Sequence, residues 1–146
     1  MVDDLLKKLE NKKITKEKLA QKIKQDFKVL PGIVNAMDSE KAAIRYGCGK
    51  ILMDLSETNP NELYPFINKF IAYLDSKYRI ITWQTMAIIA NLTKVDTKKK
   101  FDENFEKYYS FINNEYMVTV ANVVGHSGKI ALTKALHKHI VTQSGV

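Results

Sequence analysis

The chain has 146 residues, of which 45% are hydrophobic and 27% are charged, so it is long enough to fold as one domain with a buried core. Its single cysteine, Cys48, excludes an internal disulfide framework. The N-terminus places acidic residues before its lysines and has no apolar run, so we expect no signal peptide and a cytoplasmic protein.

Basic residues outnumber acidic ones by 23 to 16, which gives a formal net charge of +7. The excess lies at the two ends of the chain. Residues 1–28 hold nine lysines and five acidic residues, residues 29–93 hold six charges of each sign, and residues 94–146 hold eight basic and five acidic residues. Such ends could attract nucleic acid or an acidic partner, although solvated lysines on surface helices are the commoner explanation.

Only six glycines and three prolines interrupt the sequence, which predicts a mostly helical protein. The first amphipathic pattern covers residues 2–9, and its apolar side consists of Leu5, Leu6 and Leu9. Ile14 and Thr15 then predict a hydrophobic staple and an N-cap for a second helix.

The second helix carries apolar residues four positions apart, at Leu19, Ile23 and Phe27, with lysines on the opposite side. Pro31 cannot donate a backbone hydrogen bond and disfavours helix in the residue before it, so a boundary or kink is expected there. A further helix is expected to run to about Met37.

The stretch from Ile80 to Thr93 contains no charged residue over about four helical turns. Its large side chains, among them Ile81, Trp83 and Met86, point in several directions, which predicts a helix enclosed by its neighbours. The stretch is too short and too polar to span a bilayer, so we expect no membrane association.

The sequence around this stretch repeats. Residues 38–55, shifted by 37 positions, align with residues 75–92, and the aligned positions are mostly those expected to be buried. The aligned pairs are Asp38 with Asp75, Ala43 with Ile80, Ile44 with Ile81, Tyr46 with Trp83, Ile51 with Ile88, Leu52 with Ile89, and Leu55 with Leu92.

The segments that follow these helices repeat as well. Asn59 and Asp96 are expected to cap them, and Pro60 suits a first helical position. At a shift of 38 the aligned pairs are Leu63 with Phe101, Ile67 with Phe105, Phe70 with Tyr108, Ile71 with Tyr109, and Leu74 with Ile112. An earlier segment joins them at a shift of 37, with Leu30, Ile33, Val34 and Met37 aligned with Ile67, Phe70, Ile71 and Leu74.

A third copy begins at Asn113. It places Val118, Ala121, Val124 and Ile130 in the register of Ala43, Tyr46, Gly49 and Leu55. A short last helix, capped by Thr133 and carrying Leu136 and Ile140, leaves an apolar C-terminal edge through which the chain could self-associate.

A helical-hairpin period of 37 to 38 residues is the signature of a solenoid. With aspartates at Asp38 and Asp75 closing the pairs and basic residues at Arg45 and Arg79 following them, the segment from residue 26 to 140 resembles HEAT-type and related armadillo-like repeats. The resemblance implies an all-α superhelix of about three antiparallel helix pairs with an N-terminal capping helix, in a single domain, 1–146, with repeats at 15–37, 38–74, 75–112 and 113–142.

The residues Gly125 to Lys129 look like the start of a nucleophile elbow around Ser127, but the fifth position is not glycine and the alignment places a helix, not a strand, before it. His126 falls in a core register, and His137 and His139 point to opposite sides of a helix. Because no set of three or four metal ligands comes together, we expect no catalytic residue, no metal and no cofactor.

One candidate binding face lies on the second helices, which line the concave surface in HEAT-like repeats. Tyr73 and Phe111 occupy equivalent positions there, beside the buried stripe. The candidate protein-binding face consists of Phe66, Lys69, Tyr73, Asn104, Lys107 and Phe111. The alternative is that both aromatic side chains widen the core.

A second candidate surface is a basic patch. Four lysines surround the start of one helix, where positive charge opposes the helix dipole and indicates a partner: Lys94, Lys98, Lys99 and Lys100. The N-terminal helices add Lys12, Lys13, Lys16, Lys22 and Lys24. A phosphate backbone would attract both groups.

The leading interpretation is a non-enzymatic scaffold that binds a protein or peptide along its second helices. The alternative is nucleic-acid binding through the basic groups, because some HEAT-like proteins are alkylpurine DNA glycosylases. No catalytic motif of those enzymes matches this sequence residue by residue, so the resemblance does not imply their reaction here.

Overall fold

The computed structural model describes residues 2–111, 122–127 and 130, and within these residues every regular element is a helix. This confirms the predicted all-α class for the described part of the chain. The α-helices are α1 (Val2–Glu10), α2 (Lys16–Gln25), α3 (Leu30–Asn35), α4 (Ala42–Thr58), α5 (Pro60–Leu63), α6 (Ile67–Tyr73), α7 (Arg79–Leu92), α8 (Lys100–Glu103) and α9 (Phe105–Ser110). Short 3-10 turns join them at Phe27–Val29, Ala36–Asp38, Tyr64–Phe66 and Thr93–Val95.

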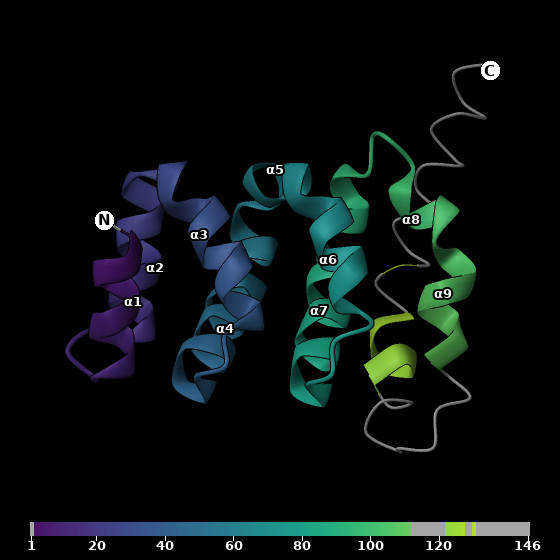
Figure 1. Cartoon of the computed structure of the whole chain (residues 1–146). Helices are drawn as coiled ribbons and strands as arrows, with labels where there is room; N and C mark the ends of the chain where they lie inside the picture. The colour runs from purple at the N-terminus through teal and green to yellow at the C-terminus, as the bar shows by residue number, and fades with distance from the viewer. Residues whose placement is uncertain (1, 112–121, 128–129, 131–146) are drawn as a thin grey trace.

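The helices stand side by side in a row that follows the order of the chain (Figure 1). At one end, α1 and α2 pack against α4, the longest helix. The other side of α4 packs extensively against α7, and α6 covers a further side of α7. The hydrophobic core runs through the whole row, from Leu5 in α1 to Tyr108 in α9.

The N-terminal predictions are confirmed except that Leu6 and Phe27 are half-buried and Phe27 lies in the 3-10 turn after α2. Leu5 and Leu9 are buried on one side of α1, and Ile14 is buried just before α2. Thr15 is the N-cap of α2, because its Oγ1 accepts a hydrogen bond from the backbone N–H of Lys18 at 3.1 Å. Pro31 lies in the first turn of α3, which begins at Leu30, so the predicted boundary falls where the proline requires it.

The 37-residue repeat is reproduced by burial in α4 and α7. Four aligned pairs are buried in both helices: Ile44 and Ile81, Ile51 and Ile88, Leu52 and Ile89, and Leu55 and Leu92. The pair of Ala43 and Ile80 is exposed in both helices, so the register also holds at a surface position.

The predicted enclosure of α7 is confirmed along most of its length, since ten of its fourteen residues are buried. It is wrong for one line of side chains near the start of the helix. Ile80 is 40% exposed and Trp83 is half-buried. These two residues are three positions apart and share one side of the helix, and that side stays partly in solvent.

Arg45 fixes the joint between successive units. Its side chain is buried, and its guanidinium donates hydrogen bonds to the carbonyl oxygens of Ser39 at 2.8 Å and Glu40 at 3.3 Å. The same guanidinium lies over the rings of Tyr78, 3.6 Å away, and Tyr46, 4.4 Å away. A cation between two aromatic faces ties the start of α4 to the turn before α7. The basic residue of the next copy, Arg79, is exposed, and at a shift of 37 Arg45 aligns with Thr82, so the two copies differ here.

The two predicted caps also differ. Asp96 accepts hydrogen bonds from the backbone N–H groups of Lys100 at 2.8 Å and Phe101 at 2.9 Å, and from the Tyr64 hydroxyl at 2.7 Å. It therefore caps the start of α8 from four residues upstream. Asn59 occupies the N-cap position of α5 but makes no side-chain hydrogen bond to that helix, so the predicted cap is wrong there.

The third predicted copy falls mostly outside the described residues, as do Asn113, Val118, Ala121, the helix after Thr133, His137, His139 and the apolar C-terminal edge. Within residues 122–127 and 130, Val123 and Ile130 are buried, whereas Val124 is 59% exposed. Ile130 is therefore buried like Leu55, with which it is aligned, whereas Val124 is exposed although its aligned residue, Gly49, is buried. Among the described helices, none is long and apolar enough to cross a membrane.

Candidate binding site

The predicted row on the second helices is not an exposed aromatic surface. Tyr73 is 7% exposed, and its hydroxyl donates a hydrogen bond to the carbonyl oxygen of Val34 in α3 at 2.8 Å. Burial raises the pKa of Tyr73 to about 12. The side chain therefore belongs to the core between α3 and α6, which was the alternative interpretation of the pattern.

The other members of this row are engaged within the protein. Phe66 and Phe111 are half-buried and pack against the hydrophobic core. Lys107 forms an ion pair with Asp75 at 2.6 Å, and the Asn104 side chain donates to the carbonyl oxygen of Lys100 at 2.9 Å. Lys69 is exposed, with its ammonium 5.6 Å from the ring of Tyr73.

The predicted basic patch lies at the turn before α8. Lys94, Lys98 and Lys99 are exposed and form no ion pair among the described residues, while Lys100 lies 3.5 Å from Glu103. This turn is near the top of Figure 1, whereas the turn between α1 and α2 is near the bottom at the other end of the row. The two basic ends therefore do not form one continuous surface.

Of the residues that resemble a nucleophile elbow, Gly125, His126 and Ser127 lie in a helix, and residues 128–129 lie outside the described residues. Residues 122–127 are helical, and the Ser127 hydroxyl donates to the carbonyl oxygen of Val123, four residues earlier, at 2.7 Å. This is an ordinary hydroxyl-to-backbone contact in a helix and lacks the strand-to-helix turn that the elbow requires. His126 is half-buried, so its predicted place in the core is wrong.

Cys48 is fully buried in α4, as expected. Desolvation raises the pKa of its thiol to about 12, so the reactive thiolate is scarce at neutral pH. Within the described residues, no group of three histidine, cysteine, aspartate or glutamate side chains is placed to hold a metal ion.

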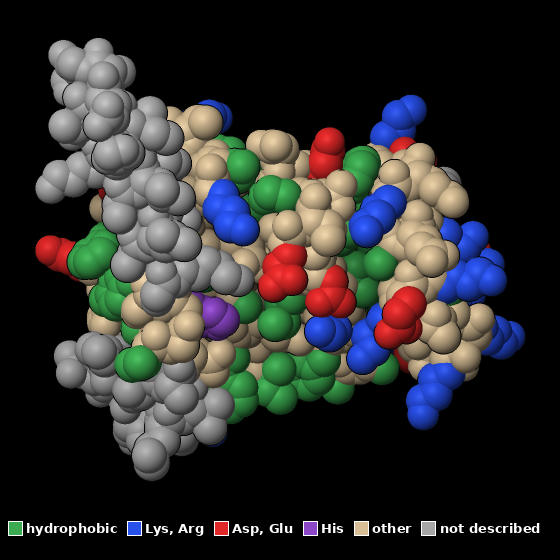
Figure 2. All heavy atoms as spheres, turned by 180° about the vertical axis from the view of Figure 1, so that it is seen from behind, with side chains coloured by type: hydrophobic (Ala, Val, Ile, Leu, Met, Phe, Trp, Pro, Cys, Tyr) green, Lys and Arg blue, Asp and Glu red, His purple; other side chains and the backbone are tan. Residues whose placement is uncertain are grey.

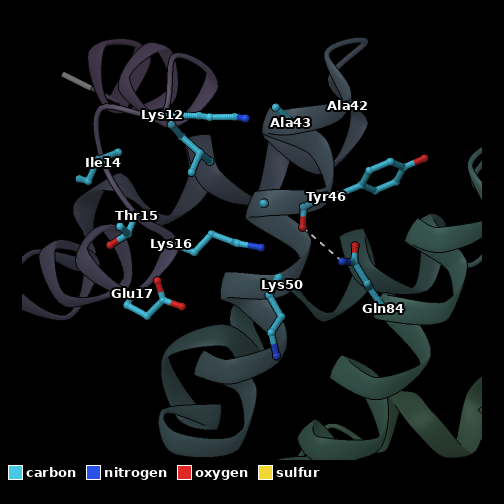
Figure 3. A pocket seen from close by; sticks show the side chains of 12 residues that line it. Lys12, Ile14, Thr15, Lys16, Glu17, Ala42, Ala43, Tyr46, Lys50 and Gln84 are labelled. Atoms are coloured by element: carbon cyan, nitrogen blue, oxygen red, sulfur yellow. Dashed lines mark hydrogen bonds between the residues drawn. The ribbon is translucent and has the colours of Figure 1, made fainter.

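A groove that the sequence did not reveal lies between the α1–α2 turn and α4 (Figure 3). Its volume is about 790 Å³, within the range of ligand-binding clefts. Lys12, Thr15 and Lys16 line one side, and Ala43 and Tyr46 line the other. The far edge is formed by Gln84 of α7.

Two glycines of α4 shape the floor and the far edge of this groove. A Cβ on Gly47 would lie 3.0 Å from Cδ2 of Leu9, so the glycine lets α1 approach α4 closely. A Cβ on Gly49 would overlap Oε1 of Gln84, so that glycine accommodates the Gln84 side chain. The Gln84 Nε2 donates to the carbonyl oxygen of Tyr46 at 3.2 Å, while its Oε1 is buried without a hydrogen-bond partner.

The charged side chains around the groove are mostly lysines. Lys12 and Lys16 are exposed and form no ion pair among the described residues. Lys50 points along α4 to Asp54, 3.1 Å away, and Glu17 is the acidic residue of the lining. Seen from behind, the basic side chains gather over the end of the molecule formed by α1 and α2 (Figure 2).

The alignment of α4 with α7 held a signal for this groove. At a shift of 37, Ala43 aligns with Ile80 and Gly47 with Gln84, so α4 carries a smaller side chain than α7 at each position. Ala43 leaves space for the groove, whereas the space at Gly47 is occupied by Leu9 of α1. No protein-family model, curated protein or solved structure matches this chain.

Proposed function

We propose that this chain is a non-enzymatic module of the HEAT-like solenoid type that binds a peptide segment of a protein partner. The architecture is supported by the row of helices and by the equivalent burial of α4 and α7 at a period of 37 residues. Solenoids of this kind present extended surfaces to their partners.

The groove beside α4 is the observation that carries the proposal. It combines a volume of about 790 Å³ with a partly exposed aromatic side chain, Tyr46, and the small exposed residues Ala42 and Ala43. Binding clefts typically pair an apolar surface with a few placed polar groups, and here Lys12 and Lys16 supply those groups. The second-helix row is the weaker site, because Tyr73 is buried there.

A peptide-display selection tests the proposal. A random-peptide library is selected on the chain and on Ala43→Trp, which fills the groove from an exposed position on α4. The control is Ala72→Trp, the same change at an exposed position on α6 outside the groove. We expect peptides that bind the chain and Ala72→Trp but not Ala43→Trp. Recovery of no such peptide would refute the proposed function.

Nucleic-acid binding is the second candidate, and the unpaired lysines at the turn before α8 favour it. If it is correct, the chain should bind a generic duplex at low salt with an affinity that falls steeply as salt rises. Changing Lys98 and Lys99 to Glu should abolish this binding, whereas the same change at Lys69 and Lys77, which are exposed and lie outside both basic groups, should not. An absence of duplex binding at low salt would remove this candidate.

A further inference from the structure

The groove is electrostatically one-sided. Its lining includes Lys12, Lys16 and Lys50 against one acidic residue, Glu17. Because Lys50 is already paired with Asp54, the charges left for a partner are those of Lys12 and Lys16, whose ammonium groups extend into the groove in Figure 3.

Two helix N-termini add to this positive potential. The first turn of α2 contributes Lys16 and Glu17 to the lining, and the first turn of α4 contributes Ala42 and Ala43. The N-terminal end of a helix carries a partial positive charge from its unpaired N–H groups. In α4 the N-cap residue makes no side-chain hydrogen bond to the helix, so those N–H groups are not satisfied by a cap.

Lys12, which lines the groove, has an unusual backbone conformation. Its φ is 59°, in the left-handed region, where glycine is the favoured residue at the end of a helix. The turn closes α1 with hydrogen bonds from the N–H groups of Lys13 and Ile14 to the carbonyl oxygen of Lys8. A lysine held in this conformation costs stability that glycine would not, so the backbone of this turn does not by itself favour lysine here.

We infer that the occupant of the groove is an acidic peptide segment, with carboxylates that reach Lys12 and Lys16 and an apolar side chain that rests on Ala43 and Tyr46. This rests on the proposed peptide-binding function. Charge complementarity selects the acidic partner, since an approaching carboxylate meets two unpaired ammonium groups and two helix N-termini, opposed only by Glu17. The apolar contact supplies the rest of the affinity.

Two pairs of matched variants test this inference. Lys12→Gly and Lys99→Gly replace the two lysines that have positive φ, but only Lys12 lines the groove. Lys16→Gln and Lys18→Gln remove one charge each from the same turn of α2. Lys18 lies about 200° around that helix from Lys16 and is not part of the lining. Each pair has the same chemical change and the same effect on net charge.

The readout is the composition and affinity of the groove-dependent peptides, defined as those that bind the chain but not Ala43→Trp. We expect them to be enriched in Asp and Glu over the starting library. Lys12→Gly and Lys16→Gln should each weaken their binding by about three- to fivefold, as expected for partly exposed ion pairs. Lys99→Gly and Lys18→Gln should leave it unchanged.

Two results would overturn the inference in distinguishable ways. Groove-dependent peptides without acidic enrichment, or an equal loss in Lys16→Gln and Lys18→Gln, would refute the acidic partner while the proposed function stands. A selection that yields no groove-dependent peptide would refute both. Circular dichroism and thermal melting of every variant confirm that each compared protein is folded.

Discussion

The two sides of α4 differ in how closely they pack against the neighbouring helices. Toward α7 the contact is closed, with Ile51, Leu52 and Leu55 buried and the Asn91 amide donating to the Ser56 hydroxyl at 2.8 Å. Toward α1 and α2 the helices also pack against α4, with Leu9 close to Gly47, but an open groove lies beside this contact.

The difference lies in the side chains at equivalent positions. On the closed side, Gln84 of α7 reaches across to the carbonyl oxygen of Tyr46 and fills the space above Gly49. On the other side, the α4 residue aligned with Gln84 is Gly47, which has no side chain, and Leu9 of α1 lies close to it. The contact with α7 therefore includes a long side chain that spans the gap, whereas the contact with α1 depends on close approach at a glycine, and the groove opens beside it.

The largest effect is expected at the closed side. Ile88 is fully buried in α7, so Ile88→Ala should lower the free energy of unfolding by about 2–5 kcal/mol through lost transfer energy and a residual cavity. Urea denaturation measures it. Ala43→Trp in the groove is the contrasting change and should alter stability by no more than about 0.5 kcal/mol. Equal losses in the two variants would show that the groove is packed core.

A substitution at Tyr73 in the second-helix row should lower stability, as substitutions on the closed side do. Tyr73→Phe removes the hydrogen bond to Val34 and should cost about 1 kcal/mol at neutral pH. The pKa of Tyr73 is raised from 10.0 to about 12 in the folded state, so its contribution is complete below pH 10 and is lost as the pH rises toward 12.

The alkaline loss of stability should therefore be smaller in Tyr73→Phe than in the unmodified chain. Some loss remains in the variant, because burial also raises the pKa of Cys48 and of Tyr108. Denaturation curves across this pH range measure the difference. Identical alkaline profiles for both proteins would place Tyr73 in solvent.

Gln84 and Gly49 should be energetically coupled. Gly49→Ala gains about 1 kcal/mol of helix propensity but displaces the Gln84 side chain, so its net effect should be near zero. In a Gln84→Ala background the same change should show the full gain of about 1 kcal/mol. A double-mutant cycle measures this coupling, and additive effects would contradict the contact.

The smallest effect has the opposite sign. Lys12→Gly relieves a left-handed backbone and should raise the free energy of unfolding by up to about 1 kcal/mol. Thermal melting measures it. A loss of stability would mean that the Lys12 side chain supports the fold, and would remove the argument from its backbone.

The helical class and the buried sides of the helices were largely predictable, because hydrophobic periodicity directly reports which side of a helix is buried. The aligned pairs Ile51 and Ile88, and Leu55 and Leu92, kept that relation in the structure. Thr15 was recognisable because an N-cap depends only on the next few residues. The cap predicted at Asn59 is absent, because the Asn59 side chain accepts a hydrogen bond from the neighbouring Thr58 hydroxyl instead.

The binding site was less predictable because it depends on distances between helices. Tyr73 and a surface tyrosine look alike in a sequence, and only the approach of α3 placed a carbonyl oxygen within reach of its hydroxyl. The groove likewise depends on how the α1–α2 turn is placed beside Ala43 and Tyr46 of α4. Lys12 and Lys16 were visible as basic residues, but periodicity alone did not assign them a shared cleft.

The buried thiol of Cys48 can be used to measure local opening of the protein. It is the single cysteine of the sequence and is fully shielded within α4. A thiol reagent can therefore modify it only when the protein opens locally, and the rate of modification reports the free energy of that opening. Because Cys48 is shielded, a cysteine introduced at Ala43 would be the thiol that reagents reach. A fluorophore can therefore be attached beside the groove without changing Cys48.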